Sequence, residues 1–559
     1  MGVFLHIIPC LAIFSLGATA LIIKIGKMIQ MTGYVLCVAG IILLCVLAEK
    51  FSDKFGMPAL ILFMFIGMLF GSDGIFGIPF DNFSLAENVC SIALVFIMFY
   101  GGFNTKWSAA KPVAGKSIVL STLGVVITAG ITTLLCKFLL GLSLQESFLI
   151  GAVLSSTDAA SVFAILRKKK LNLKDGTASI LEVESGSNDP ISYMLTIIAV
   201  SLMGDSETGS IAGLITLQIV FGILVGVLIA FLSLLILTKT NLVSEGLDTI
   251  FMIAMVFVCY GVTTVVKGNA YLSLYLLGII IGNSKIKHKQ TLIPFFDGVT
   301  SLSQILIFFL IGLLSFPHQM PEIMPQALAI VVILTVIARP VAVFLLMVPY
   351  GCGLRQCMLI SWAGLRGASS SVFAIMAVAA GITMKQDLFH IVFTVSLFSV
   401  AIQGTLLPFM AKKLRMVDDT ADVSKTFNDY QEETSFQLMR MHIPQGHNWA
   451  NKKVKEVSMP TGSLAIMIKR GKETIITKGN TLILPGDNVI LSVPPYTPSE
   501  NEQLEEQLIG KEHEWCGKSI GELKLSADEL IAMVIRGEEN IIPDGKTVIQ
   551  AGDVVVVYR

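Results

Sequence analysis

The chain has 559 residues, of which 54% are hydrophobic and only 14% are charged, whereas an average soluble domain carries about 25% charged residues. Together with a mean hydropathy of +0.77, this composition excludes an ordinary soluble protein and predicts an all-α polytopic membrane domain. The formal net charge is zero, so no field of a single sign exists to attract nucleic acid. We expect no nucleic-acid partner.

Apolar segments long enough to cross a membrane recur along the first three quarters of the chain, and about thirteen of them follow residue 32. They are 33–49, 57–71, 88–105, 118–137, 144–166, 181–203, 212–237, 247–266, 270–283, 301–315, 325–348, 353–380 and 388–411. Basic runs such as 167–170 and acidic loops such as 73–87 fall at opposite ends of these segments. If the charged C-terminal part is cytoplasmic, this distribution agrees with the positive-inside rule from the second segment onward. We expect a multi-pass protein of the cell inner membrane with a cytoplasmic C-terminus.

Residues 1–30 contain one further apolar segment, 3–23, followed by two lysines on the side that this topology places outside. Three interpretations stay open: an extra membrane helix, a leader cleaved after the small residues 18–20, or translation that begins further along the chain. No basic region precedes the apolar segment, which counts against the leader. We favour the uncleaved helix.

The nine cysteines are scattered, mostly within apolar runs, and form no CxxC pair and no metal-ligand spacing with histidine. They predict neither a disulfide framework nor a resident metal site. The sequence also shows no pairing of a nucleophile with a base. We expect no cofactor and no enzymatic activity.

The composition changes abruptly after the membrane segments, and residues 413–434 read as a polar, acidic linker. Beyond it the chain repeats itself without gaps at an offset of 66 residues (447 to 513). The repeat superimposes His447 on His513, Trp449 on Trp515, Arg470-Gly471 on Arg536-Gly537 and Gly486-Asp487 on Gly552-Asp553. Such a repeat predicts two copies of one small α+β module, at residues 435–495 and 500–559. Each copy is expected to end in a strand entered through Gly-Asp, at 488–493 and 554–558.

The two modules resemble the TrkA-C type, the C-terminal and ligand-sensing half of the domain that regulates potassium conductance. The nucleotide-binding half has no counterpart here, because no GxGxxG motif follows a predicted strand. The resemblance implies a small regulatory ligand held by the modules and argues against a dinucleotide sensor.

The most informative polar stretch inside the apolar part of the chain is 181–190. As a helix, it places Glu184 and Asn188, and likewise Ser185 and Asp189, four residues apart on one face. The proline that follows Asp189 disturbs the next turn. Oxygen ligands beside opened backbone suit a dehydrated alkali cation, and burial without a cation favours the protonated carboxyl group. One site can then hold either a cation or a proton; the alternative is that Asp189 only caps a kinked helix.

A second polar stretch, Ser155-Ser156-Thr157-Asp158, lies in the middle of another apolar segment. Four consecutive polar residues are hard to satisfy in an unbroken helix that faces lipid, but they suit a discontinuous helix whose free backbone groups line a cavity. The alternative is hydroxyl groups that bond back to the preceding turn, with Asp158 paired to a neighbouring helix. Both arrangements are compatible, since Asp158 could orient Asn188.

Arg366 lies well inside the apolar segment 353–380. A permanently charged guanidinium group at such a depth requires an anionic partner. We predict Glu184 as this partner, because Asp189 must stay free to exchange its load. The alternative, in which Arg366 extends to a membrane surface, fits its position less well.

Three motifs carry a resemblance to a known family. ESGSNDP (Glu184–Pro190), STDAASVF (Ser156–Phe163) and GLRGA (Gly364–Ala368) resemble, in order and spacing, those of the cation:proton antiporter family with the NhaA-type fold. The resemblance covers nearly all of residues 31–412, and the TDAA form with the appended modules is most similar to potassium/proton antiporters of the NhaP type. It implies inverted repeats, discontinuous helices, a homodimer and a moving ion-binding bundle.

The resemblance also implies roles for individual residues. Asp189 would carry the transported ion, Thr157, Asp158 and Ser185 would complete its cation shell, Asn188 would support Asp158, and Glu184 and Arg366 would form a structural ion pair. Two departures leave the number of cation ligands and the selectivity open. An acidic residue that often precedes the Gly101-Gly102 pair in relatives is Tyr100 here, and a proline that often follows GLRGA is replaced by Ser369-Ser370-Ser371.

We therefore predict a secondary antiporter that exchanges a monovalent cation, preferably K⁺, for H⁺. Exchange is expected to be electroneutral, because Asn188 occupies the place of the second acid of electrogenic relatives. A Na⁺/H⁺ antiporter with the same mechanism is the nearest alternative. A ligand-gated cation channel is a further alternative, although the sequence contains no carbonyl filter of the TVGYG kind.

Overall fold

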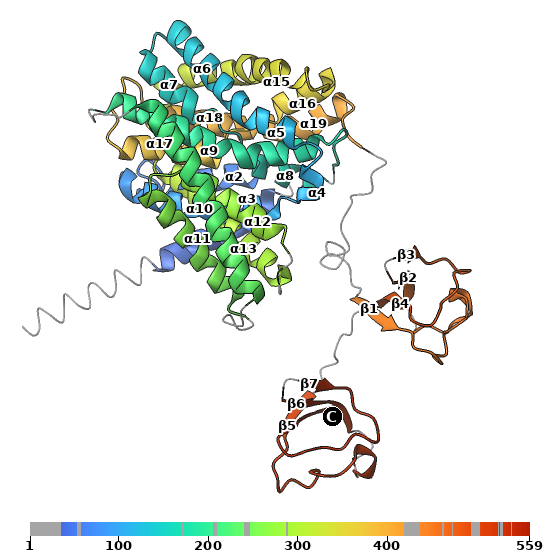
Figure 1. Cartoon of the computed structure of the whole chain (residues 1–559). Coiled ribbons are helices and arrows are strands. Elements are labelled where there is room, and N and C mark those ends of the chain that lie inside the picture. Colours follow the sequence, from blue (N-terminus) through green and yellow to red (C-terminus); the bar gives the residue numbers. More distant parts are fainter. Residues whose placement is uncertain are drawn as a thin grey trace, which may run out of the picture. The chain divides into compact units, whose positions relative to one another are not determined.

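The computed structural model of the chain describes residues 35–418 and 437–558, apart from short stretches at 53–57, 170, 205–209, 240–245, 285, 287–288, 461–462, 472, 494–503, 524, 526–528 and 538. It divides into two compact units, residues 1–423 and 424–559. The first unit is helical and the second is built from strands (Figure 1). Segment 1–30 and most of the predicted linker 413–434 lie outside the described residues.

The helices of the first unit pack in two groups (Figure 1). One group contains α2 (Ala59–Phe70), α3 (Phe83–Asn104), α10 (Ile211–Lys239), α11 (Asp248–Val265), α12 (Ala270–Gly282) and α13 (Lys289–Leu313). The short helix α4 (Trp107–Ala110) leads to the other group. This contains α5 (Ala114–Val119), α6 (Val125–Leu140), α7 (Leu144–Val153), α8 (Ala159–Lys168), α9 (Thr177–Met203), α14 (Met320–Val332), α15 (Arg339–Met347), α16 (Leu354–Trp362), α17 (Ala368–Ala379), α18 (Leu388–Phe398) and α19 (Thr405–Lys413).

Three members of the second group continue into their neighbours through a π-helical turn. These turns are η1 (Leu120–Gly124) between α5 and α6, η3 (Ile333–Ala338) between α14 and α15, and η4 (Ser399–Gly404) between α18 and α19. Such turns widen a helix locally and are frequent at functional sites.

Glycines hold the first group together by close helix approach. A side chain on Gly67 of α2 would lie 2.2 Å from the carbonyl oxygen of Phe309 on α13, and one on Gly278 of α12 would lie 2.2 Å from that of Phe99 on α3. Because lipid tails are as apolar as the helices, small residues at the contact and the van der Waals packing they permit drive association in a membrane.

Eight apolar helices among the described residues are long enough to cross a membrane, which makes the first unit an integral membrane domain. They are Val35–Ser52, Phe83–Asn104, Ala114–Leu140, Ile211–Thr238, Asp248–Val265, Thr291–Leu313, Pro317–Met347 and Leu388–Lys413. Four shorter apolar helices accompany them: Ala59–Phe70, Leu144–Val153, Ala270–Gly282 and Ala368–Ala379. Helix α9 has 27 residues but carries three acids, at 182, 184 and 189.

The second unit contains two four-stranded antiparallel sheets of identical strand order, β1-β4-β2-β3 and β5-β8-β6-β7. The first consists of β1 (Gln437–His442), β2 (Leu464–Arg470), β3 (Glu473–Ile476) and β4 (Asn488–Val493), and the second of β5 (Leu504–Leu508), β6 (Leu530–Arg536), β7 (Glu539–Ile541) and β8 (Val554–Tyr558). The helical part of each predicted α+β module is a single 3₁₀ turn among the described residues, Val454–Glu456 in the first copy and Ile520–Glu522 in the second. The register shifts at Ala465/Met467 and at Ile531/Met533, which are equivalent repeat positions.

The repeated Gly-Asp pairs have the same geometry in both copies. Gly486 has φ +89° and Gly552 has φ +94°, a backbone region that favours glycine. The aspartate carboxylate that follows each glycine accepts hydrogen bonds from Nε and Nη2 of the repeated arginine. Arg470 donates to Asp487, and Arg536 donates to Asp553. These hydrogen bonds hold the pKa of each of the two carboxyl groups below its ordinary value.

Candidate functional site

Two helices among the described residues of the first unit are interrupted, and their unwound segments meet. Residues 154–158 separate α7 from α8, and residues 363–367 separate α16 from α17. The backbone N–H of Asp158 donates to the carbonyl oxygen of Leu365 at 2.8 Å, which joins the two segments directly. The predicted break at the run of four polar residues is therefore confirmed, and a second break lies within the GLRGA motif.

Gly367 lies where the two unwound segments meet, at a position with no room for a side chain. A Cβ atom there would lie 2.0 Å from Oδ2 of Asp158. The Asp158 carboxylate accepts hydrogen bonds from the backbone N–H and the hydroxyl group of Ser161, at 3.2 and 2.6 Å. It thus satisfies the first turn of α8, as carboxylates do at helix N-termini.

The carboxylate of Asp189, on α9, accepts hydrogen bonds from both interrupted helices. Asp189 is 4% exposed. The hydroxyl group of Ser156, in the first break, donates to its Oδ1, and the hydroxyl group of Ser369, in the first turn of α17, donates to its Oδ2 at 2.6 Å. Among the described residues the carboxylate has these neutral donors and no ion pair. Neutral donors stabilise a carboxylate without neutralising it.

Glu184 lies five residues before Asp189 on α9 and has a charged partner. Arg339, at the start of α15, donates from Nη1 to Oε1 at 3.0 Å and from Nη2 to Oε2 at 2.8 Å. Both side chains are almost fully buried, 2% and 1% exposed. The prediction that Glu184 pairs with Arg366 is wrong, because the two-pronged contact that a carboxylate favours with a guanidinium group is made by Arg339.

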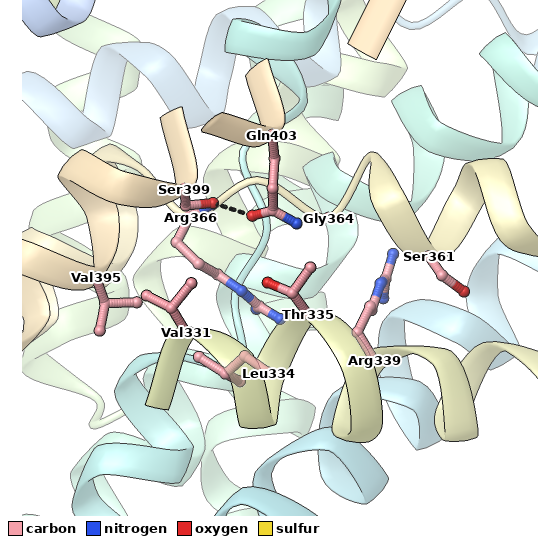
Figure 2. Close-up of a pocket in the computed structure, with 10 residues that line it drawn as sticks. All are labelled: Val331, Leu334, Thr335, Arg339, Ser361, Gly364, Arg366, Val395, Ser399 and Gln403. Atoms are coloured by element: carbon pink, nitrogen blue, oxygen red, sulfur yellow. Dashed lines mark hydrogen bonds between the residues drawn. The ribbon is translucent and has the colours of Figure 1, made fainter. Parts of the chain in front are cut away.

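Arg366 instead holds the first break in place. Its Nη1 donates to the carbonyl oxygen of Ser156 at 2.7 Å, and its backbone N–H donates to the hydroxyl group of Ser399 at 3.0 Å. Figure 2 shows Arg366 and Arg339 on the same small pocket, whose wall also includes Gln403, hydrogen-bonded to Ser399. Both arginines thus face one region, but only Arg339 meets Glu184.

Asn188 and Thr157 connect the two carboxylate environments. Asn188 Nδ2 donates to the hydroxyl oxygen of Thr157 and to Oε1 of Glu184, at 3.3 Å for the latter. The hydroxyl group of Ser185 donates to the carbonyl oxygen of Thr157 at 2.7 Å. The expected support of Asp158 by Asn188 is replaced by these contacts, since Asp158 turns toward Ser161. All the predicted site residues nevertheless lie around one crossing.

Sequence reasoning missed three residues of this site: Ser156, Arg339 and Ser369. Arg339 had a detectable signal, because it is a permanently charged residue in the apolar segment 325–348, as Arg366 is in its own. Ser156 stood within a motif that was noticed. Ser369 was noticed only as a departure from the family pattern, with no hint that its hydroxyl group reaches α9.

A buried carboxylate at the crossing of two interrupted membrane helices is the arrangement of ion-coupled secondary transporters. A model of the family described as "Sodium/hydrogen exchanger, transmembrane" matches residues 39–413, and the chain belongs to this family. The TrkA-C domain matches twice in the second unit, at residues 438–496 and 504–558. The duplication read from the sequence is thus a pair of TrkA-C domains.

Known relatives are similar over most of their length. The chain is 31% identical to the "K(+)/H(+) antiporter NhaP" of Alkalimonas amylolytica over 82% of this chain and 80% of the relative. It is also 31% identical to the "K(+)/H(+) antiporter NhaP2" of Shewanella sp. (strain MR-4), over 79% of this chain and 78% of the relative. The chain is 26% identical to the "Na(+)/H(+) antiporter ApNhaP" of Aphanothece halophytica, over 60% of this chain and 66% of the relative.

A solved structure shares the fold. The sodium proton antiporter MjNhaP1 from Methanocaldococcus jannaschii, determined at pH 8, superimposes with a TM-score of 0.59 at 20% sequence identity. The match covers 67% of this chain and 98% of that chain. At this identity the likeness concerns the architecture of the membrane unit.

Proposed function

We propose that the protein is a secondary antiporter that exchanges a monovalent cation, preferably K⁺, for H⁺ by alternating access. The observation that carries the proposal is the environment of Asp189, which is buried where two interrupted helices meet and is held by hydroxyl groups alone among the described residues. Such a carboxylate has no permanent counter-charge to displace. It is free to take up either a proton or a dehydrated cation.

Competition for Asp189 supplies the coupling. A cation and a proton cannot both occupy the carboxylate, so each conformational return of the ion-binding bundle carries one or the other. Glu184 is neutralised by Arg339 and therefore does not take part. One positive charge then crosses in each direction for every cycle, which supports electroneutral exchange.

We further propose a cation shell of Thr157, Asp158, Ser185 and Asn188, which lie at the same crossing of the interrupted helices as Asp189. In addition to its two donated hydrogen bonds, Asn188 has a buried carbonyl oxygen, Oδ1, with no hydrogen-bond partner among the described residues. An unpaired buried acceptor is costly, and an alkali cation would satisfy it. The chemistry of these ligands is that of hard oxygen donors, which suits K⁺ and Na⁺ alike.

The preference for K⁺ is supported by the relatives that cover most of this chain, which are named K(+)/H(+) antiporters. The exchange of Na⁺ for H⁺ is the alternative, supported by the name of the more distant ApNhaP.

Pairs of matching features support inverted repeats. The break between α7 and α8 matches the break between α16 and α17. The π-helical turn η1, in the helix that precedes the first break, likewise matches η3, in the helix that precedes the second. Adding α2, α12, α9 and the two interrupted helices to the eight long spans brings the total to about thirteen. We also propose the family's homodimer, and an inner-membrane location with the C-terminus and both TrkA-C domains in the cytoplasm.

A contact at the start of the linker offers a route for regulation by a small ligand of the TrkA-C domains. Val417 forms an antiparallel bridge with Leu173, and the N–H of Lys174 donates to the carbonyl oxygen of Met416 at 2.9 Å. Residues 172–174 lead into α9, which carries Asp189. Truncation after Asp418, which preserves this bridge, should leave transport intact but change its pH or ligand dependence. Unchanged dependence would remove the regulatory role.

The proposed activity is tested by cation-induced proton release from inverted membrane vesicles, followed with a fluorescent ΔpH probe. Addition of K⁺ should dequench the probe with the wild-type protein and fail to do so with Asp189→Asn. Full exchange by Asp189→Asn would refute the site assignment, and a response to Na⁺ alone would replace K⁺ as the substrate. A current driven by ion gradients in planar bilayers at zero potential would contradict electroneutrality.

A further inference from the structure

We propose that Ser369 is a direct ligand of the transported cation and sets the apparent affinity for it. The inference rests on the proposed function and adds a residue from the second interrupted helix to the site. Ser369 is the second residue of α17, immediately after the unwound segment 363–367, and is 8% exposed.

The contact between Ser369 and the carboxylate is direct. Its Oγ lies 2.6 Å from Oδ2 of Asp189, while the hydroxyl group of Ser156 donates to Oδ1. Each interrupted helix therefore contributes one hydroxyl group, and each carboxylate oxygen receives one of them. The two groups together stabilise the charged carboxylate when neither a cation nor a proton neutralises it.

A hydroxyl group can serve every state of an exchanging carboxylate. It has one proton to donate and two lone pairs to offer, and it rotates to suit its surroundings. When a cation binds beside Asp189, the Ser369 proton turns away and a lone pair faces the cation. When Asp189 is protonated, the same lone pair accepts a hydrogen bond from the carboxyl O–H. An amine or guanidinium group in this place could only donate.

The neighbouring serine provides a matched comparison. Ser371 lies on the same turn of α17 and is 1% exposed, but its hydroxyl group donates to the carbonyl oxygen of Gly367, the residue before α17, at 3.2 Å. It has a second hydroxyl neighbour, Ser396, at 3.4 Å. Removing the Ser371 oxygen therefore tests the loss of a buried serine from α17 without touching Asp189.

The experiment measures K⁺-dependent proton release in inverted vesicles for wild type, Ser369→Ala, Ser369→Cys, Ser369→Thr and Ser371→Ala. Ser369→Ala should raise the apparent KM for K⁺ about tenfold, the effect of one lost charge-assisted contact, with the maximal rate within about twofold. Ser369→Thr keeps the oxygen and should stay within about threefold of wild type. Ser371→Ala should match wild type.

Ser369→Cys separates the ligand from the packing. The substitution approximately conserves the size of the side chain but offers a soft sulfur atom, which is a poor ligand for K⁺. Ser369→Cys should therefore raise the KM for K⁺ about as much as Ser369→Ala. If Ser369→Ala fails to fold, Ser369→Cys still tests the inference. A wild-type KM in Ser369→Cys would overturn the inference, as would a lower maximal rate at unchanged KM. Absence of cation-coupled proton movement in the wild-type protein would instead refute the proposed function itself.

Discussion

Helix α9 carries two buried carboxylates five residues apart, Glu184 and Asp189, and they are held in opposite ways. Glu184 meets both prongs of a guanidinium group, whereas Asp189 meets one hydroxyl group on each oxygen. The first partner carries a fixed charge that cannot leave, so its carboxylate is locked. The second partners are neutral and can reorient, so their carboxylate can exchange its load. We therefore propose that the kind of partner, and not burial alone, distinguishes an exchanging intramembrane acid from a structural one.

The largest expected effect comes from removing the charge of Glu184, the carboxylate that is paired with Arg339. Glu184→Gln leaves Arg339 buried without its counter-charge, and breaking one side of a buried pair costs about 3–5 kcal/mol. We expect a clear fall in the yield of folded protein and in the midpoint of thermal unfolding in detergent. Glu182→Gln removes an acid from the same helix and is the control. A Glu184→Gln protein as stable as wild type would contradict the locked role.

A double-mutant cycle tests which of the two buried arginines is the partner of Glu184. Glu184→Gln and Arg339→Gln should show a coupling energy of about 1–3 kcal/mol in denaturant titrations, because each removes the other's partner. Glu184→Gln and Arg366→Gln should be coupled about half as strongly or less, since Arg366 binds the carbonyl oxygen of Ser156. Equal coupling of both arginines would restore the pair predicted from sequence.

The hydrogen bonds of Asp189 depend on the place where the two unwound segments meet, because one hydroxyl donor comes from each interrupted helix. Gly367→Ala places a methyl group against the Asp158 side chain, and such overpacking costs about 1–3 kcal/mol. We expect reduced stability and a larger loss of transport. Gly353→Ala is the matched control, because a Cβ atom at Gly353 meets no atom within 4 Å. Equal stability and equal transport in the two variants would show that the unwound segments can move apart without loss of function.

The smallest effect concerns the same kind of pair outside the membrane. Arg470 donates twice to Asp487 and lowers the pKa of that carboxyl. The folded-state pKa lies below the unfolded value of about 3.9, so the pair stabilises the domain at neutral pH and loses this contribution as the pH falls through the folded pKa. Because Arg470 is 35% exposed, Asp487→Asn should cost only about 1 kcal/mol at pH 7.

Hydrogen exchange of β2 and β4 in the full-length protein measures this difference. Exchange should be faster in Asp487→Asn than in wild type at pH 7, and the difference should narrow below about pH 4. The equivalent Asp553→Asn should act in the same way on β6 and β8. A difference that grows on acidification would contradict the sign of the pKa shift.

Much of this architecture could be predicted from the sequence. The run at residues 155–158 predicted a broken helix because its polar groups cannot be satisfied in lipid, and the ungapped repeat predicted two equal domains with the strands Asn488–Val493 and Val554–Tyr558. The spacing on α9 placed Glu184 and Asn188 on one face of a helix, and in the structure Asn188 donates a hydrogen bond to Glu184.

The partner of Glu184 could not be predicted in the same way. Two apolar segments each contain one deeply placed arginine, and spacing along a helix gives no information on which of two distant helices approaches. The hydrogen bond from Ser369 to Asp189 could not be predicted for the same reason, because it depends on the direction in which α17 leaves the unwound segment 363–367. Contacts between elements that are far apart in sequence required the structure.

The account is tested most directly by the thermal stability of purified protein with and without K⁺, compared in wild type, Asp189→Asn and Glu184→Gln. K⁺ should raise the unfolding midpoint of wild type by mass action. Asp189→Asn should fold at least as well as wild type and lose this increment, because it removes an unpaired buried charge and the ion ligand together. Glu184→Gln should unfold at lower temperature. Retention of the K⁺ increment by Asp189→Asn would contradict Asp189 as the exchanging carboxylate.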